Sequence, residues 1–511
     1  MLPKIFRGTL LALTTVVCAS FPPTYAPLTE QKVTTSNSTV NPDNDVNKSS
    51  INWQPCVQPS FANWFPSYAE VDTLQCATIE VPLINAGTPT VIELAISRLP
   101  ASGSEQQKLG TLISISGGPG QSGLDVSPIN SAAYQKLSRH FDIIGYAPRG
   151  VHPSTPTVKC STVDRVLTPE DAESFAQGCW DHTPHDLLTQ LGADYAVNDI
   201  EAIRQALGVP KVSLIGYSYG TKIAALYAEK FPQYLRAGVL DGVVNLNDTE
   251  LQMAVNQSVA VQKTFERFLT ACRQKSDCYF ADTNTVAAAE AKLAKLYYYI
   301  ESHQLYDLDG QRILPVSLSG IIYDSLMWPE QWPMLDSLFH QLENEDFELY
   351  KQLIADQKDN TDFATFAAIL CADGAPTSTK KAAYIDDIKR VDALLTWDDF
   401  RKFTDKEIVD TCYYWPIAGS DIPHVPKLSP SAPPLLLIAQ TDDPATPYIN
   451  ALAMQKYLNS VLLTRNSDGH TLALSDLSSC VDNQVVDYLI DPNSLANGNN
   501  NSRQGNIYCA K

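Results

Sequence analysis

The segment Gly216-Tyr217-Ser218-Tyr219-Gly220 places a serine where it could act as a nucleophile. A predicted strand, Lys211–Ile215, leads into the segment, and a predicted helix, Thr221–Phe231, follows it. Such a sharp strand-to-helix turn crowds the backbone, and glycines two positions before and after the serine relieve the crowding and leave its Oγ exposed. The pattern alone arises by chance in roughly one chain of this length in six, so its position between strand and helix carries the interpretation. We expect Ser218 to be a catalytic nucleophile.

A glycine-rich turn, Ser116–Gly123, follows the predicted strand Leu109–Ser116. Backbone N–H groups in such a turn can stabilise an oxygen that becomes negatively charged during a reaction. We expect the N–H groups of Gly118 and Tyr219 to do so, whereas Pro119 has no N–H to donate. A phosphate-binding loop is the alternative, but no Lys-Ser or Lys-Thr pair follows at the spacing that it requires.

A histidine and a carboxylate should follow the serine, because a nucleophile on this kind of turn is activated by residues in the chain order Ser, Asp or Glu, His. Four histidines follow Ser218, and the three that fall within or at the edge of a predicted helical insertion are His303, His340 and His424. The fourth, His470, lies just after the predicted strand Val461–Arg465. We therefore expect His470 to accept the proton of the serine.

Three carboxylates compete for the role of the acid. Asp443 and Asp442 follow the predicted strand Pro434–Ala439, and Asp241 ends an earlier strand. We favour Asp443, because Pro444 would fix the turn that presents its carboxylate. Asp442 and Asp241 remain alternatives, although an aspartate before a glycine, as at Asp241, is commonly a turn residue. A serine, a histidine and a carboxylate can form and hydrolyse an acyl-enzyme, and this chemistry requires no cofactor.

Strands and helices alternate around these residues, as expected of a mostly parallel sheet with helices on both faces. Further predicted strands are Val91–Leu99, Phe141–Tyr146 and Ala237–Leu240, and further predicted helices are Asp194–Leu207, Ile449–Leu458 and Val481–Leu489. After about residue 245 the pattern changes to long helices, such as Leu251–Arg273 and Thr285–Glu301. The predicted fold is an α/β core of residues 53–245 and 426–511 with an inserted helical cap of residues 246–425.

The N-terminal residues predict export. Lys4 and Arg7 precede an apolar stretch, roughly Leu10–Cys18, which ends at small residues in the manner of a signal peptide cleaved after Ala19. A membrane anchor is the alternative, but about ten apolar residues are too few to span a bilayer of about 30 Å. We predict a signal peptide of residues 1–19, a flexible linker of residues 20–52, and a periplasmic or secreted protein.

Length, hydrophobic content and net charge limit the classes of protein to which this chain can belong. The chain has 511 residues, of which 44 % are hydrophobic, and this is enough for a catalytic core and a second module. Its formal net charge of −20 would repel nucleic acid and anionic lipid, so neither is an expected partner. After the leader, no apolar stretch reaches the length of about 18 residues that a transmembrane helix needs, so we expect no contact with the membrane once the leader is removed.

Cysteine usage agrees with export, because removal of Cys18 with the leader leaves ten cysteines, an even number. We predict bridges between sequence neighbours: Cys56–Cys76, Cys160–Cys179, Cys272–Cys278, Cys371–Cys412 and Cys480–Cys509. A structural zinc site is the alternative, but there is no C-x-x-C pair and no cysteine cluster with histidine at ligand spacing. We therefore expect no metal ion.

With these residues, the chain resembles the secreted tripeptidyl aminopeptidases, relatives of the proline iminopeptidases in the α/β-hydrolase superfamily. The resemblance covers roughly residues 53–511 and rests on Gly117-Gly118-Pro119-Gly120, Pro148-Arg149-Gly150, Gly216-Tyr217-Ser218-Tyr219-Gly220-Thr221, Cys371-Ala372-Asp373, Cys412 with Trp415-Pro416, and Asp443-Pro444-Ala445-Thr446-Pro447. It implies an α/β-hydrolase fold with a helical cap over the site. It also implies that Asp443, not Asp442, completes the triad with Ser218 and His470, because the carboxylate of the family directly precedes such a proline.

Two positions depart from the family pattern and leave substrate preference open. Ala147 stands where the relatives often carry aspartate, and Thr471 stands where glycine is frequent. An aminopeptidase needs a carboxylate to hold the free ammonium group of its substrate. In the predicted cap, Glu330 and Asp373 are the candidates for this role.

The predicted function is release of short peptides, tripeptides according to the resemblance, from free N-termini through an acyl-enzyme on Ser218. An exported carboxylesterase with the same triad is the alternative, and a non-catalytic binding module of the same fold is a remote one. Epoxide hydrolase and dehalogenase chemistry need a carboxylate at the position of Ser218 and are excluded. A peptide substrate is the expected partner, and no oligomeric state is predicted.

Overall fold

The computed structural model describes residues 51–510, with the exception of residues 62, 66–72, 84–90, 126–130, 161–168, 361–362, 377–380, 399–409, 421 and 498–504. The predicted signal peptide, residues 1–19, and the predicted linker up to residue 50 lie outside the described residues. None of the described helices is long and apolar enough to cross a membrane.

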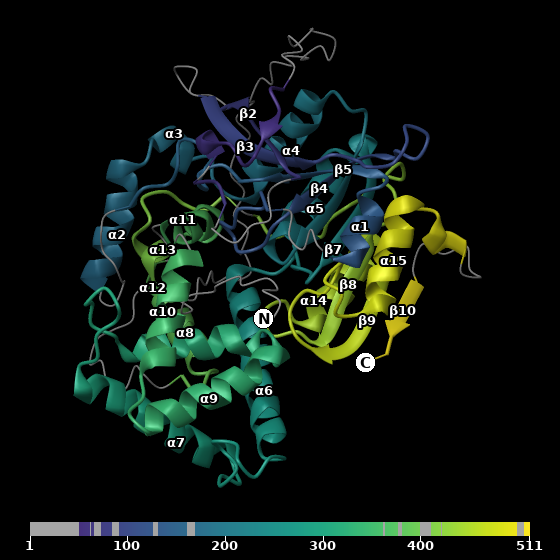
Figure 1. The fold of residues 1–511 in the computed structure, drawn as a ribbon. Helices are drawn as coiled ribbons and strands as arrows, with labels where there is room; N and C mark the ends of the chain where they lie inside the picture. The colour runs from purple at the N-terminus through teal and green to yellow at the C-terminus, as the bar shows by residue number, and fades with distance from the viewer. Residues whose placement is uncertain are drawn as a thin grey trace, which may run out of the picture.

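A ten-stranded sheet forms the centre of the described chain (Figure 1). Its strands lie in the order β1-β2-β3-β5-β4-β6-β7-β8-β9-β10. Neighbours are antiparallel from β1 to β5 and parallel from β5 to β10, so the sheet is mostly parallel, as predicted. The strands are β1 Gln54–Pro55, β2 Gln75–Pro82, β3 Val91–Leu99, β4 Gly110–Ile115, β5 Phe141–Tyr146, β6 Val212–Tyr217, β7 Leu235–Asp241, β8 Leu436–Asp442, β9 Val461–Asp468 and β10 Gly505–Cys509.

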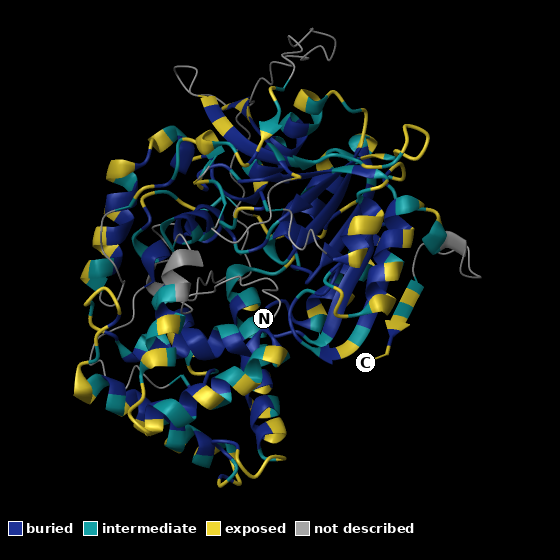
Figure 2. Ribbon diagram, in the orientation of Figure 1, coloured by how far each residue is buried: buried dark blue, intermediate teal, exposed yellow. Residues whose placement is uncertain are grey.

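Helices cover both faces of this sheet. Because successive side chains of a strand point to opposite faces, Leu214 and Leu240 join one buried core, while Ile215 and Val239 join another. The first core contains residues of α2 (Pro169–His182), α3 (His185–Leu188), α4 (Ala193–Leu207), α5 (Tyr219–Lys230) and α14 (Tyr448–Leu458), and the second contains residues of α1 (Ala132–Leu137) and α15 (Ser479–Ile490). Figure 2 shows the strands as the most buried part of the molecule.

The described residues between β7 and β8 form helices and no strand. In Figure 1, α6–α9 lie together at one end of the molecule, and α11–α13 lie beside α2. The helices are α6 Glu250–Cys272, α7 Val286–His303, α8 Pro315–Leu326, α9 Trp332–Glu343, α10 Glu348–Asn360, α11 Phe363–Gly374, α12 Lys381–Asp392 and α13 Thr411–Tyr414.

These helices belong to two different cores. α6–α10 share a core of their own, rich in aromatic rings such as Phe265, Phe268 and Phe339. α11–α13 instead contribute Ala368, Cys371 and other buried residues to the core of the sheet. The helical insertion is therefore anchored on the α/β core through its second half, while its first half packs largely on itself. The boundaries 246 and 425 of a separate cap stay a prediction.

The structure confirms the five predicted disulfides. Two of them join two different helices or a helix and a strand: Cys371 of α11 is bonded to Cys412 of α13, and Cys480 of α15 is bonded to Cys509 of β10. Disulfides are typical of proteins that fold in an oxidising compartment.

Candidate active site

Ser218 lies at a sharp turn, directly after β6 and directly before α5. Its φ of 53° is in the left-handed region, which residues with side chains rarely adopt. A side chain at Gly216 would collide with the backbone of Gly220, so strand and helix approach too closely there for a residue other than glycine. The Ser218 N–H donates to the backbone oxygen of Asp241 at a distance of 2.8 Å, which ties the turn to the end of β7.

The glycine-rich turn lies beside Ser218. A Cβ on Gly117 would lie 3.0 Å from the Cβ of Ser218, so the turn and the serine are in close contact. The next residue, Gly118, has a φ of 100°, a conformation that favours glycine. Tyr219 is the first residue of α5 and lies at the positive end of that helix. Both segments that carry the expected oxyanion donors, Gly118 and Tyr219, therefore adjoin the serine, and their role in catalysis stays a prediction.

His470 and Asp443 form a buried pair at the ends of β9 and β8. The Nδ1 atom of His470 is 2.9 Å from Asp443 Oδ2 and 3.0 Å from Oδ1, and the two residues are only 7 % and 2 % exposed. Thr446 holds the carboxylate from the other side, because its N–H donates to Oδ1 and its hydroxyl donates to Oδ2. With Nδ1 directed at the carboxylate, Nε2 is the imidazole nitrogen that can exchange a proton with a substrate or a nucleophile.

The environment of His470 changes its affinity for protons. Burial disfavours the charged imidazolium, whereas the negative charge of Asp443 and its hydrogen bond to the ring favour it. Together with a smaller contribution from Asp241, these interactions raise the pKa of His470 above its ordinary value. The imidazolium that would form during catalysis is therefore stabilised in place.

Asp442, the neighbour of Asp443, faces away from this pair. Its Oδ1 is 3.3 Å from Nη1 of Arg267 in α6, and its side chain is 36 % exposed. Arg267 also binds Asp468, two positions before His470. The structure thus brings Asp443, and not Asp442, to the histidine.

Asp241, the third candidate acid, contacts the backbone after His470 instead of its ring. Its Oδ2 accepts the N–H groups of Leu472 and Ala473, each at 2.6 Å. Burial raises the pKa of Asp241 to about 6, although these two N–H groups lower it. Since its backbone oxygen accepts from Ser218, this residue connects the serine turn with the histidine loop.

The helical insertion contacts the site from two sides. The N–H of His470 donates to the backbone oxygen of Met327, 3.0 Å away at the end of α8, and the ring of Trp328 lies edge-on to the imidazole. On the other side, a Cβ on Gly120 would lie 3.2 Å from the backbone nitrogen of Phe366 in α11, so that helix rests directly on the glycine-rich turn. The predicted catalytic histidine and the predicted oxyanion turn therefore both lie against the helical insertion.

The two carboxylates expected to bind a substrate amine have different surroundings. Glu330 is exposed and lies in a short 3-10 helix, Pro329–Gln331, two residues after Trp328. Asp373 is buried in α11, where it accepts from Tyr219 Oη at 2.7 Å and from the N–H of Ala193 at 3.0 Å, and it pairs with Lys222 at 3.0 Å. The positive charge of Lys222 thus already balances Asp373.

Sequence comparisons agree with this geometry. The family described as alpha/beta hydrolase fold matches residues 110–295, and the family described as TAP-like protein matches residues 398–501. The putative hydrolase YuaR of Escherichia coli is 31 % identical over 470 residues, which are 86 % of this chain and 91 % of that protein. The chain belongs to the TAP-like α/β hydrolases. The predicted enzyme class, a serine hydrolase, is confirmed by this fold together with relatives named a serine protease and a tripeptidyl aminopeptidase.

Other relatives of this TAP-like hydrolase have names that specify an activity. The serine protease Hip1 of Mycobacterium tuberculosis is 28 % identical over 86 % of this chain and 88 % of its own length. The tripeptidyl aminopeptidase of Streptomyces coelicolor is 25 % identical over 87 % of this chain and 84 % of its own length. Carboxylesterase B of Mycobacterium tuberculosis is 28 % identical over 83 % of this chain and 85 % of its own length.

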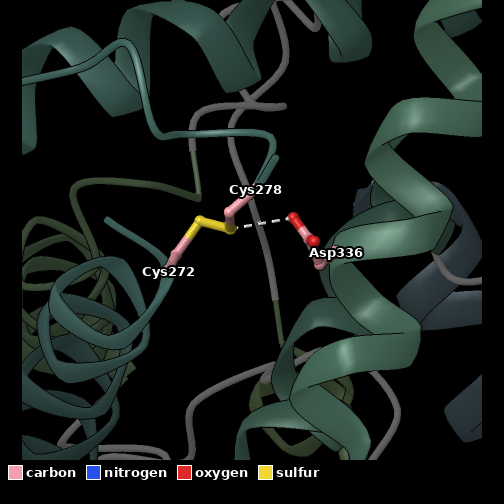
Figure 3. Close-up of side chains that lie close together, drawn as sticks. All are labelled: Cys272, Cys278 and Asp336. Atoms are coloured by element: carbon pink, nitrogen blue, oxygen red, sulfur yellow. Dashed lines mark hydrogen bonds between the residues drawn. A yellow bond between two sulfur atoms is a disulfide. The ribbon is translucent and has the colours of Figure 1, made fainter. Parts of the chain in front are cut away.

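Two clusters among the described residues of the TAP-like hydrolase have the residue types of a metal site. One joins Cys272 and Cys278 with Asp336 (Figure 3), and the other joins Cys371 and Cys412 with Asp410. In both, the two cysteines are bonded to each other, so their sulfurs are not the thiolates that bind zinc or similar ions. Asp336 instead accepts the N–H of Tyr279 at 2.8 Å, which fixes the short disulfide loop after α6.

The sequence did not predict the contacts that two side chains, Arg267 and Asp241, make at the site. Arg267 was not singled out, and Asp241 was weighed only as an acid. Their partners in the acid and histidine loops lie 175 to 232 residues away along the chain, as for Arg267 with Asp442 and Asp241 with Ala473. No local motif marks such a contact, and only the folded arrangement shows it.

Proposed function

We propose that the protein is an exported serine peptidase that releases short peptides, tripeptides in particular, from free N-termini. The observation that carries the proposal is the buried Asp443–His470 pair on the loops next to the strained Ser218 turn. The names of two relatives, a serine protease and a tripeptidyl aminopeptidase, support a peptide bond as the one that is broken. The five disulfides and the predicted leader support export.

In the proposed reaction, His470 Nε2 takes the hydroxyl proton of Ser218 as its Oγ attacks the carbonyl carbon of the scissile bond. The N–H groups of Gly118 and Tyr219 stabilise the resulting oxyanion, and Asp443 stabilises the imidazolium. The imidazolium then gives its proton to the leaving amine, and an acyl-enzyme remains. A water molecule attacks the acyl-enzyme with the same base, which releases the short peptide and restores the serine.

We assign Glu330 to the substrate ammonium in preference to Asp373. Asp373 shares its carboxylate among a lysine and two other donors, so a second cation would have to displace them. Glu330 is exposed and lies in the segment of the insertion that contacts His470. A carboxylate at a fixed distance from Ser218 would also limit how many residues fit between the N-terminus and the scissile bond.

A matched pair of fluorogenic tripeptides tests the proposed activity, one with a free amino terminus and one with an acetylated terminus. We expect wild-type protein to cleave the free peptide alone and Ser218→Ala to cleave neither. Turnover that survives in Ser218→Ala would reject the serine mechanism. Equal cleavage of both peptides would reject the requirement for a free N-terminus.

The variant Glu330→Gln tests the assigned anchor. We expect it to raise KM for the free tripeptide by about 10- to 100-fold, because a charge-assisted contact contributes about 1.5–3 kcal/mol, and to leave hydrolysis of a short blocked ester unchanged. Glu348→Gln is the matched control, because Glu348 is an exposed acid on α10 in the same insertion. Loss on both substrates would contradict the role in binding the amine.

A carboxylesterase is the second candidate, and it is favoured by the relative named carboxylesterase B. It would use the same serine, acid and histidine, since acyl transfer to Ser218 is common to both reactions. Cleavage of short esters together with no cleavage of either tripeptide would favour this candidate over the peptidase.

A further inference from the structure

One guanidinium group on helix α6 reaches both loops that carry the acid and the histidine. Arg267 Nε binds Asp468, which precedes His470 by two residues. Nη2 donates to the backbone oxygen of Asp442 at 3.2 Å, and Nη1 is 3.3 Å from the carboxylate of the same residue. Since Asp442 directly precedes Asp443, a single side chain connects the bases of both loops.

The guanidinium is itself held in place. Arg267 Nη2 also donates to the hydroxyl of Thr264, 2.7 Å away and one turn earlier on α6. Ten residues before Arg267, Gln257 Nε2 donates to the backbone oxygen of Ala445, on the far side of Asp443, at 2.9 Å. Helix α6 therefore holds the acid loop both before and after Asp443.

Apolar packing accompanies these polar contacts at Ala445, which joins the buried core formed by α6 and its neighbours. An open pocket of about 340 Å³ also lies between α6 and the acid loop, lined by Lys263 and Arg267 of the helix and by Asp442 and Tyr448, among others. A pocket removes the close contacts that would otherwise fix two segments against each other. The position of the acid loop relative to α6 thus depends on the packing of Ala445 and on the hydrogen bonds beside this pocket.

We propose that Arg267 is a positioning residue that holds the acid loop and the histidine loop in the register needed for the Asp443–His470 pair, and that it couples this register to the helical insertion. The inference rests on the proposed roles of Asp443 and His470. Arg267 suits this task because its planar guanidinium presents several donors in a fixed arrangement, whereas a lysine would present one point charge.

Loss of Arg267 should affect the catalytic rate more than it affects the free energy of unfolding. Arg267 is 30 % exposed, and Asp442 and Asp468 are 36 % and 20 % exposed, so each ion pair is partly screened by solvent. Loss of the guanidinium should therefore leave the protein folded. Catalytic geometry is more sensitive, since a misplacement of about 1 Å at the reacting groups can lower a rate by about 100-fold.

A double-mutant cycle tests the proposal with Arg267→Met, Asp468→Asn and the combination of both. The rate is measured with a short activated ester, which both candidate activities would turn over, and is normalised to the active sites that a fluorophosphonate labels. We expect each single variant to lower kcat by about tenfold with KM within twofold of wild type, and the double variant to lower kcat by about tenfold as well. Arg267→Lys should recover only part of the loss.

The control is Arg273→Lys, in which the same type of side chain changes on the same helix. Arg273 binds Thr283 and Thr285 within the insertion, so kcat should stay at the wild-type value. Wild-type kcat in Arg267→Met, or a hundredfold loss in the double variant, would overturn the inference. Ser218→Ala is assayed in parallel: ester turnover that persists there would reject the proposed function itself, whereas turnover that depends on Ser218 but not on Arg267 rejects only the positioning role.

Discussion

At the scale of single residues, Asp442 and Asp443 are adjacent in sequence and have opposite surroundings. Asp443 is buried against His470 and Thr446, whereas Asp442 lies at the surface beside Arg267. The difference arises at the end of β8, where the chain turns through Pro444 and directs the second carboxylate inward. The two residues therefore form a natural matched pair for mutation.

We predict that Asp443→Asn lowers kcat by about 10⁴-fold, because an amide at this position would favour the wrong tautomer of His470. Asp442→Asn keeps the buried pair and should cost far less, about tenfold at most, through its contact with Arg267. The measurement is kcat on a short ester for both variants, with circular dichroism to verify that each is folded. Equal losses would contradict the assignment of the acid.

The dependence of activity on pH is a second prediction at this scale. His470 must be neutral to accept a proton, and its surroundings raise its pKa above the ordinary value of about 6.5. Activity should therefore be complete at alkaline pH and fall as the pH drops, with a midpoint above about 6.5. A profile of kcat/KM from pH 5 to 9 measures this, and a midpoint below about 6 would contradict the stabilised imidazolium.

The sequence identifies a candidate catalytic residue where a local motif, or the order of residue types along the chain, indicates its role. Ser218 has a local motif, and His470 was found because the other three histidines that follow the serine fall within or at the edge of the helical insertion. Neither a motif nor chain order predicts the contacts that Asp241 makes in the structure. The sequence presents it as an aspartate before a glycine, and its binding of Leu472 and Ala473 depends on the pairing of β7, β8 and β9.

At the scale of elements, the unit formed by β6, Ser218 and α5 depends on two glycines that let a strand and a helix meet at close range. A side chain on Gly216 would collide with Gly220, and one on Gly220 would collide with the backbone of Ile115 in β4. All the atoms in these collisions belong to backbone, which cannot rotate away as a side chain would. The turn is therefore sterically determined on both sides of the serine.

We predict that Gly216→Ala lowers kcat/KM by at least about 100-fold, because the turn must shift to accommodate the methyl group. The control is Gly505→Ala in β10, where the nearest atom would lie 3.9 Å from the added Cβ and activity should be unchanged. Steady-state kinetics on both variants measures the difference. Wild-type kcat/KM in Gly216→Ala would contradict the inference that this position excludes a side chain.

Several elements with strong local patterns were predicted closely, whereas β10, which depends on a distant partner, was missed. β3 and β5 have the predicted ends, α4 and α14 differ from prediction by one residue at the first position, and α6 differs by one residue at each end. β2 and β10 were not predicted. β10 contains Gly505, Asn506 and Tyr508 in a five-residue strand and is a strand because it pairs with β9, more than forty residues earlier in the chain.

At the scale of the whole molecule, disulfides fix segments of very different length. The bond between Cys371 and Cys412 spans 41 residues and connects two helices that pack on the α/β core. The bond between Cys272 and Cys278 spans only 6 residues and closes a local loop after α6. A longer closed loop restricts the unfolded chain more, so the two bonds should contribute unequally to stability.

We predict that Cys371→Ala/Cys412→Ala lowers the free energy of unfolding by about 4 kcal/mol, and that Cys272→Ala/Cys278→Ala lowers it by about 2 kcal/mol. Denaturant titration of both variants and of the wild type gives the two differences. The opposite order would mean that strain or residual structure, and not the length of the closed loop, determines the effect.

The helical insertion leaves the sheet and returns to it through adjacent strands. Val239 of β7 is paired with Leu436 of β8, although almost two hundred residues separate them in the chain. The chain leaves the sheet after Asp241 and re-enters it at Leu436, which is two residues out of register with Asp241. The two points of attachment are thus about 8 Å apart, given strands spaced about 4.8 Å apart and a rise of about 3.3 Å per residue. Helices of this segment that contact neither the sheet nor the loops of Asp443 and His470 can therefore change in number or length without changing the register of the strands that carry the reacting groups. Descendants of one ancestral hydrolase could therefore diversify in the substrates that they admit while they inherit an unaltered reaction centre.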